Sequence, residues 1–170
     1  MTTIGVAVPI PDPYGSELRQ YRTDFGDPLA ASVPTHITLL PPTEIADGLL
    51  DEIDLHLQAV AARYPRFKIR LRGTGTFRPV SPVVFVTVAE GISSCEVLQS
   101  LVRSGPLEIP LRFPYHPHVT VAHDLDKDAL DSAFDTLVDY ECSFEVAAFS
   151  RYEHGDDGVW RPQRGFALAG

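Results

Sequence analysis

Apolar residues in this chain follow two periods, and the change between them divides the sequence into strands and helices. Residues 83–88 form a continuous β-branched and aromatic run, which is typical of a strand buried on both faces. Leu50, Ile53, Leu57 and Val60 recur at helical spacing and predict one buried helix face. The predicted strands are residues 3–9, the stretch around 36–39 closed by Pro41 and Pro42, 67–73, 83–88, 107–113, 118–121, 142–152 and 159–168. The predicted helices are residues 13–25, 47–64, 93–102 and 126–138.

Capping residues mark where these helices are expected to begin. Asp12 precedes a first-turn proline, and Asp47 and Asp126 precede the second and fourth helices, where a carboxylate can accept from the free amides of a first turn. Ser93 and Glu96 have the spacing of a capping box for the third helix. Residues 153–158 predict a hairpin loop between the last two strands.

The order of these elements repeats along the chain. Each half reads strand, helix, strand, helix, strand, and the distance from Ile4 to His36 (32 residues) is close to that from Val83 to His118 (35 residues). This indicates an internal duplication. We expect an α+β fold with two pseudo-two-fold related lobes, which mix roughly residues 1–78 and 79–170, within one domain. Mainly antiparallel sheets would then face each other across a central cleft.

The two halves share one chemical motif, a histidine and a threonine two residues apart in a strand. His36 and Thr38 point to one face of their strand, and His118 and Thr120 do the same 82 residues later. One imidazole can accept a proton while the other donates one, and two hydroxyls can hold oxygen atoms. Two such strands facing each other therefore predict a phosphate site.

Charge narrows the class of ligand. The chain has 23 acidic and 14 basic side chains, a formal charge of −9, whereas proteins that grip long nucleic acids through their backbone usually present a basic face. Six basic residues within residues 63–78 could still form a local basic rim: Arg63, Arg66, Lys68, Arg70, Arg72 and Arg78. Lys68, Arg70 and Arg72 share one strand face by alternation, and we expect this to be an ordinary solvated face. Small nucleotides or the phosphate at an RNA end fit this charge better than long duplexes.

Composition and cysteine content give only general expectations. Apolar residues make up 44% of the chain and charged residues 22%, values that are ordinary for a globular protein. The two cysteines form no disulfide framework, and no apolar run reaches the length of a membrane span. We therefore expect a cytoplasmic monomer without membrane contact.

The chain resembles a known family, the 2H phosphoesterases, which include 2′-5′ RNA ligase-like proteins and RNA 2′,3′-cyclic phosphodiesterases. The resemblance covers most of the chain, and two His-x-Thr motifs half a chain apart are its most specific part. The segments that carry it are VPTHITLLPP at 33–42, FKIRLRGTGTF at 67–77, PVVFVTV at 82–88 and YHPHVTVAH at 115–123. It implies a bilobal fold with the two motifs facing across a groove.

The resemblance also implies a reaction that needs neither metal nor cofactor. His36 and His118 would be the acid–base pair, with His36 as the acid and His118 as the base, and Thr38 and Thr120 would bind phosphate oxygens. The substrate would be a 2′,3′-cyclic phosphate or a 2′-5′-linked nucleotide. Three alternatives stay open: a 2′-5′ RNA ligase, a nucleotide- or phosphate-binding module without turnover, and an enzyme for a cyclic phosphate that is not a nucleotide.

Further residues near the motifs complete the expected site. His123 occupies the position where many family members carry an arginine, and it cannot clamp a phosphate bidentately. Phe77 and Tyr115 can each stack on a base or pack as ordinary aromatics. A metal site of His116, His118 and His123 is not favoured, because His118 and His123 face opposite sides of a regular strand. Trp160 is expected to pack in the last strand.

Overall fold

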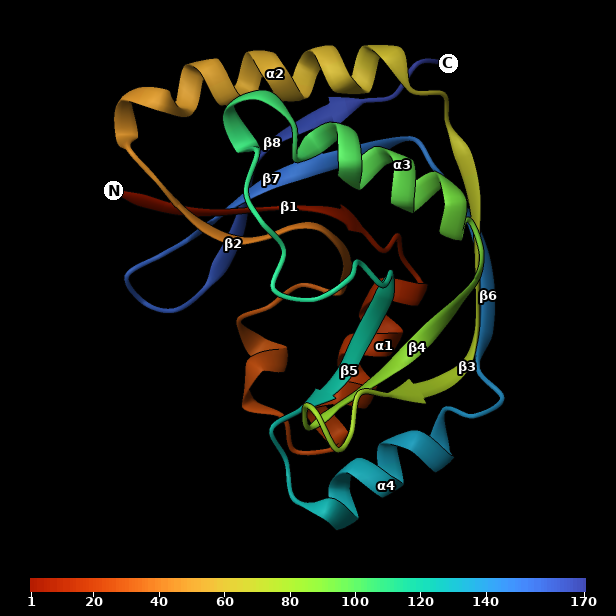
Figure 1. Cartoon of the computed structure of the whole chain (residues 1–170). Coiled ribbons are helices and arrows are strands. Elements are labelled where there is room, and N and C mark those ends of the chain that lie inside the picture. Colours follow the sequence, from red (N-terminus) through yellow and green to blue (C-terminus); the bar gives the residue numbers. More distant parts are fainter.

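Eight strands form two four-stranded antiparallel sheets in the structure, a computed structural model that describes residues 1–170 (Figure 1). The first sheet has the order β2-β1-β7-β8, with β1 at Thr2–Pro9, β2 at His36–Ile45, β7 at Ala148–His154 and β8 at Trp160–Ala167. The second has the order β5-β4-β3-β6, with β3 at Phe67–Thr76, β4 at Val83–Glu90, β5 at His118–His123 and β6 at Glu141–Val146. In both sheets the strand that carries a His-x-Thr motif is an edge strand.

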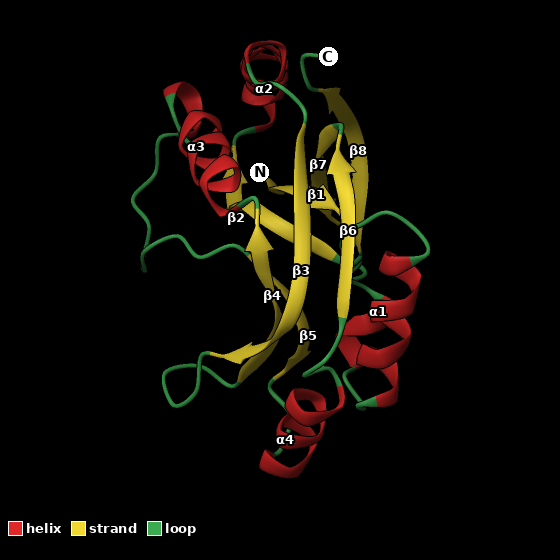
Figure 2. Ribbon diagram, turned by 90° about the vertical axis from the view of Figure 1, so that its right-hand side faces the viewer, coloured by secondary structure: helices red, strands yellow, loops and turns green.

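Four α-helices cover the outer faces of the sheets (Figure 2). They are α1 (Tyr14–Asp24), α2 (Leu50–Arg63), α3 (Ile92–Val102) and α4 (Lys127–Thr136), with short 3₁₀ turns at Pro28–Ala31, Asp47–Leu49 and Gly105–Leu107. α2 contacts β8 and α3 contacts β2, whereas α1 and α4 contact strands of the second sheet. One continuous hydrophobic core of 33 buried residues joins these layers.

The expected α+β fold and the repeated element order are confirmed, but the two sheets do not divide the chain near residue 78. β3 lies in the second sheet, and the first sheet is completed by β7 and β8 from the end of the chain. The expected single strand at 142–152 is two strands, because the chain passes from the second sheet to the first at Ala147. Each sheet is therefore made of a motif strand, its antiparallel partner and two further strands.

Three other local predictions are wrong. β2 continues through Pro41 and Pro42, which an edge strand tolerates because it has no neighbour on one side. Residues 108–117 form no strand, since prolines remove backbone donors there and the Arg103 guanidinium takes up the carbonyl of Ile109 (3.1 Å). Asp47 binds the hydroxyl of Thr2 instead of capping α2.

Of the other predicted helix caps, one is confirmed and two differ from the prediction. Asp126 accepts from the amide of Ala129 (2.8 Å) and caps α4 as predicted. Asp12 accepts from the amide of Ser16 (3.0 Å), although Pro13 is the residue at the cap position of α1. Gly91 precedes α3, and neither Ser93 nor Glu96 forms a capping hydrogen bond there. The spacing of apolar residues thus predicted where the helices lie better than the capping residues predicted where each helix begins.

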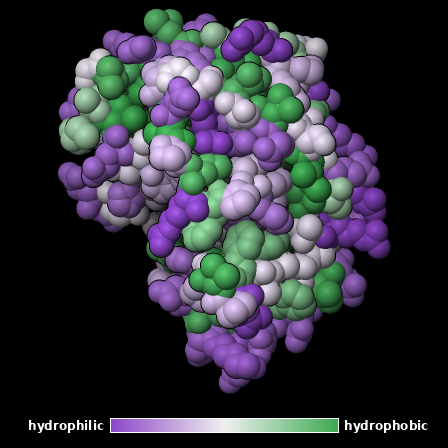
Figure 3. Space-filling model, viewed as in Figure 1, coloured by the Kyte–Doolittle hydropathy of each residue, from purple (hydrophilic) through white to green (hydrophobic).

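The surface visible in Figure 3 is mostly polar, with apolar residues interspersed. Figure 3 shows hydrophilic residues along the outer edges of one face, with small apolar patches between them. None of the helices has both the length and the apolar character needed to cross a membrane.

Candidate active site

The two motif strands lie next to each other, one from each sheet. β2 contacts β5, and the hydroxyl of Tyr115 donates a hydrogen bond to the carbonyl oxygen of Thr38 across the boundary between the sheets (2.8 Å). Tyr115 therefore links the segment before one motif to the middle of the other. Its pKa is raised, chiefly by burial, so this hydroxyl stays protonated and can act as a donor.

Both histidines are held in the same way by the backbone. Nδ1 of His36 lies 2.6 Å from the carbonyl oxygen of Pro34, and Nδ1 of His118 lies 2.7 Å from that of His116. A carbonyl oxygen only accepts, so Nδ1 carries the proton in each ring and Nε2 remains free. A proline close before each motif sets the extended approach that brings this carbonyl under the ring. The two half-sites thus present the same nitrogen for chemistry.

A β-bulge follows the threonine of each motif. In β2 the register steps from Ala7–Thr38 to Val6–Leu40, and in β5 it steps from Phe85–Thr120 to Val84–Ala122, so Leu39 and Val121 are extra residues. Bulges re-aim side chains and are common beside active sites. Here the same irregularity occurs in both motif strands.

The bulge in β5 corrects the expected position of His123. Directly paired residues of antiparallel strands share a face, and His123 pairs with Val83 while Thr120 pairs with Phe85, two residues further along β4. His123 therefore lies on the same face as Thr120 and His118, not on the opposite one. Regular alternation fails because Val121 adds one residue to the strand.

All seven side chains predicted for the site are half-buried: His36, Thr38, Phe77, Tyr115, His118, Thr120 and His123. The hydroxyls of Thr38 and Thr120 bind no other protein group, whereas those of Thr43 and Thr76 bind nearby carbonyls. Two unpaired hydroxyls on accessible strand faces are therefore free to meet a ligand.

Burial shifts both histidines toward the neutral form. It lowers the pKa of His118 to about 4, against the opposing effect of the His116 carbonyl, and the charges of His116 and His36 lower it further. The pKa of His36 is also lowered, mainly by burial and in part by the positive charge of Arg22. The charge of His36 is among the causes that lower the pKa of His118, so each imidazole disfavours the protonated form of the other.

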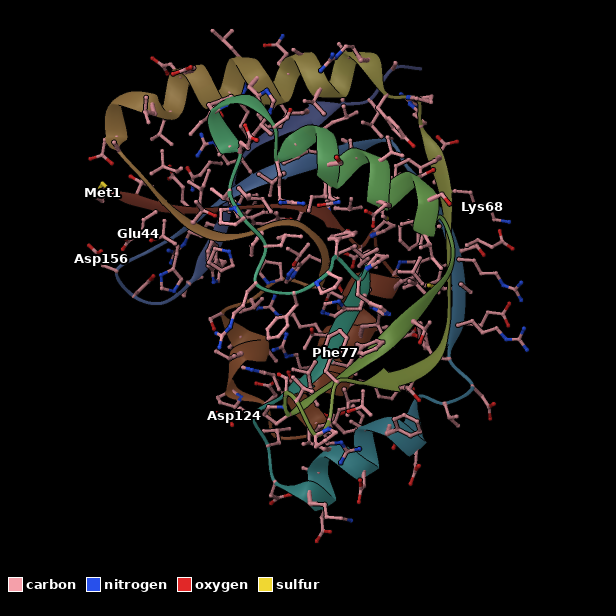
Figure 4. The ribbon with its side chains drawn as sticks, in the orientation of Figure 1. Met1, Glu44, Lys68, Phe77, Asp124 and Asp156 are labelled. Carbon is pink, nitrogen blue, oxygen red and sulfur yellow. The ribbon has the colours of Figure 1, made fainter.

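Aromatic rings surround His118. Phe77 meets the His118 ring edge to face with centroids 4.9 Å apart, and it packs on Phe85 at 4.6 Å. Phe85 also contacts His118 at 5.2 Å, and His116 closes the cluster. Figure 4 shows Phe77 over the strands of the second sheet. The prediction that Phe77 belongs to the site region agrees with this position, but its ring is already packed on the histidine.

The surroundings of His36 are less filled than those of His118. A pocket of about 170 Å³ lies beside it, and its lining includes Gly5, Ala7, Tyr152 and Trp160. Trp160 is the first residue of β8, and its ring lies over Gly5. Sequence analysis assigned Trp160 to strand packing, and no motif pointed to the pocket because its residues come from three distant segments of the chain.

A buried ion pair beside the motifs was also missed. Asp27 accepts from Nε of Arg22 (2.8 Å) and from the backbone amide of His123 (3.0 Å) through the same oxygen. Both side chains are almost fully buried. Asp27 thereby ties α1 to the end of β5 and keeps a cation close to His36.

The basic stripe predicted on β3 is remote from the motifs. Arg70 binds Glu141 through Nε (2.8 Å) and also pairs with Glu90, while Lys68 pairs with Glu90 as well. Figure 4 shows Lys68 pointing outward at the edge of the molecule away from Phe77. This confirms the interpretation of a solvated strand face. No group of three or more His, Cys, Asp or Glu side chains is arranged to hold a metal ion.

Two pseudo-symmetric sheets with facing His-x-Thr edge strands define the architecture of the 2H phosphoesterases. A family model described as the 2′-5′ RNA ligase superfamily matches residues 10–158. The chain therefore belongs to this superfamily, as the sequence resemblance predicted.

Relatives and solved structures agree with this membership. A Bacillus licheniformis protein named "Putative phosphoesterase" is 28% identical over 150 residues, covering 87% of this chain and 88% of its own. A Bacillus pumilus protein of the same name is 29% identical and covers 87% and 86%. The fold is similar to that of Escherichia coli LigT complexed with 3′-AMP, with a TM-score of 0.75, 20% identity and 99% of both chains covered. TT0787 of Thermus thermophilus gives a TM-score of 0.70 at 25% identity, covering 100% of this chain and 99% of its own.

Proposed function

We propose that this protein is a metal-independent phosphoesterase that hydrolyses a 2′,3′-cyclic phosphate or a 2′-5′-linked nucleotide with His36 and His118. The observation that carries the proposal is the matched pair of Nδ1–carbonyl hydrogen bonds, which leaves one free Nε2 in each half-site. Two such nitrogens on adjacent motif strands suit acid–base catalysis on one phosphate. Superfamily membership and the phosphoesterase-named relatives support the reaction class.

The proposed step opens a cyclic phosphate in line. Neutral His118 takes a proton from water through Nε2 as the water oxygen bonds to phosphorus. The bond from phosphorus to the ribose 3′ oxygen breaks, and protonated His36 gives its Nε2 proton to that oxygen. The product is a 2′-phosphate, with His36 neutral and His118 charged, and exchange with solvent restores the starting state. The Thr38 and Thr120 hydroxyls hold the non-bridging oxygens.

Arg22 supplies the positive charge that this site lacks at position 123. Its charge is one of the causes that lower the pKa of His36. A bound phosphate brings negative charge that favours the protonated form of His36, so substrate binding itself counteracts the lowered pKa of the proposed acid.

A nucleotide substrate is favoured over a long RNA. The LigT structures include complexes with 3′-AMP, ATP and phosphate, and these share the fold of this chain. On β3, Lys68 and Arg70 are paired with carboxylates, and Lys68 points away from Phe77 (Figure 4), so these residues do not support a track for a nucleic-acid backbone toward His36. The ligase alternative needs such a track.

The test is hydrolysis of 2′,3′-cyclic nucleotides by chelator-treated protein, with the product identified by phosphorus NMR. Wild-type protein should yield a 2′-phosphate, and His36→Ala and His118→Ala should each lose roughly 10²- to 10⁴-fold in kcat. His56→Gln is the matched control, because His56 lies on α2 and its Nε2 is 3.0 Å from the carbonyl oxygen of Val102 on α3. Unchanged turnover in His36→Ala would sink the proposal. Nucleotide binding without any product would instead identify a binding module.

A further inference from the structure

The face of the first sheet that carries His36 continues into an apolar pocket that extends from the motif strand β2 to β8. Pairing places Thr38 beside Ala7 on β1, and Gly5 beside Tyr152 on β7, all on one face. Trp160 pairs with His154, which shares that face with Tyr152. The motif and the pocket therefore form one continuous surface.

Small residues on β1 create this space. Gly5 and Ala7 form the floor between the motif strand and the aromatic residues of β7 and β8. A Cβ atom added at Gly5 would lie 3.5 Å from the ring of Trp160, which shows that the indole lies directly over the backbone at this position. The indole contributes to the lining together with Val33 and Pro34, and the backbone amide of Trp160 donates to the carbonyl oxygen of Ser32 (2.9 Å).

The pocket has the chemistry of a site for a neutral flat ring. Its lining is mainly apolar, and none of its eleven residues is Asp, Glu, Lys or Arg. Its volume of about 170 Å³ is below the range of roughly 300–1,000 Å³ that buries a whole drug-sized ligand, so it suits a single ring system. Tyr152 adds a polar group, since its hydroxyl makes no hydrogen bond to the protein.

We propose that this pocket, with Trp160 as its stacking platform, is the nucleobase subsite of the enzyme. The proposal rests on the proposed function, because it takes the phosphate to lie between His36 and His118. Aromatic side chains stack on every base, and the surrounding apolar atoms exclude water from the ring face. The base then lies against Trp160, and the ribose bridges from the pocket to Thr38 and His36.

This placement fixes the direction of the reaction. The leaving oxygen is a ribose oxygen, so it lies on the nucleoside side of the phosphorus, beside His36. In-line attack brings water from the opposite side, beside His118. The subsite thus gives a structural reason for His36 as the acid and His118 as the base. Pro34 connects the pocket to the proposed acid, since it lines the pocket and its carbonyl oxygen accepts from Nδ1 of His36.

Trp160 is the only tryptophan of the chain, so base stacking can be observed directly. Titration of wild-type protein with adenosine, under selective tryptophan excitation, should quench the fluorescence saturably, whereas inorganic phosphate should leave it unchanged. Absence of quenching by both adenosine and 3′-AMP would overturn the subsite. This measurement needs no variant and no turnover.

Kinetics of Trp160→Ala provide the second test. The variant should lose roughly 10- to 100-fold in kcat/KM for 2′,3′-cyclic AMP, the range expected for one base–aromatic stack. It should keep wild-type activity on a glycerol cyclic phosphate, which has no base. Leu55→Ala, which removes an exposed side chain of α2, is the control. Equal losses on both substrates would contradict the subsite.

The two proposals fail in different ways. Saturable quenching without turnover of any cyclic phosphate would reject the proposed reaction and keep the base site. Turnover that ignores the base, together with no quenching, would reject the base site and keep the reaction.

Discussion

The two half-sites carry the same motif but are filled differently. On the side of His36, the partner strand β1 presents Gly5 and Ala7, and a pocket remains between the motif and Trp160. On the side of His118, the partner strand β4 presents Phe85 at the position equivalent to Ala7, and Phe77 packs on top of it. A pocket therefore lies beside His36, whereas aromatic rings pack against the imidazole of His118.

The comparison separates what the duplication preserves from what it changes. The carbonyl under each Nδ1, the unpaired threonine hydroxyl and the bulge after it occur in both halves. These features depend on the backbone of an edge strand, so they persist while side chains on the neighbouring strand vary. The two half-sites therefore differ at positions of β1 and β4, whereas the features that they share lie on β2 and β5.

The largest change in stability is expected when an aromatic ring is removed from the surroundings of His118. Phe85 is 5% exposed and packs on Phe77, His116 and His118. Phe85→Ala should lower the free energy of unfolding by about 3–5 kcal/mol, because it removes a buried ring and leaves a cavity. Urea denaturation measures this change. Phe113→Ala is the control, since its ring is 59% exposed, and a comparable loss there would show that burial at Phe85 is not the cause.

Two glycines, one beside each motif, test the difference in packing between the two half-sites by the addition of a single methyl group. A Cβ atom on Gly75 would lie 2.6 Å from the ring of Phe85, whereas one on Gly5 would lie 3.5 Å from the ring of Trp160. Gly75→Ala should therefore destabilise the protein by about 1–3 kcal/mol through overpacking. Gly5→Ala should be neutral or slightly stabilising, because it also restricts the unfolded chain. Thermal unfolding measures the Tm of both variants. Equal shifts in Tm would contradict the expected difference in packing.

Much of the fold followed from sequence because its signals are local. The continuous run at β4, the helical spacing of α2 and the repeated element order each lie within one segment, and all were confirmed. The strand at 142–152 was wrong because an apolar strand pattern does not report the sheet to which each part belongs. β7 joins β1, which is more than a hundred residues away, and no local pattern carries that information.

The site was predictable only where its residues share a strand. The two His-x-Thr motifs could be located because side chains at i and i+2 share a face. The face of His123 was wrong because the bulge at Val121 adds a residue that no pattern signals. Trp160 and Arg22 were missed because a pocket and a buried ion pair bring together segments that are far apart in sequence.

The smallest expected effect concerns the pH dependence of the two histidines. As the base, His118 must be neutral, and because its pKa is about 4, kcat/KM should rise as the pH increases through that value. As the acid, His36 must be protonated, and because its pKa lies below 6.5, kcat/KM should fall before neutral pH. The optimum of kcat/KM is therefore expected between about pH 4 and 6.5, and an optimum above pH 7 would contradict the assignment.

Arg22 offers a way to move one limb of this profile without the other. Its positive charge is among the causes that lower the pKa of His36 but not among those that act on His118. Arg22→Gln should therefore shift the alkaline limb to higher pH and leave the acidic limb in place, whereas Arg22→Lys, which keeps the charge, should leave both. Titration of the histidine ring protons by NMR checks the same shifts in the absence of substrate. A joint movement of both limbs would mean that Arg22 acts by holding the fold together rather than through its charge on His36.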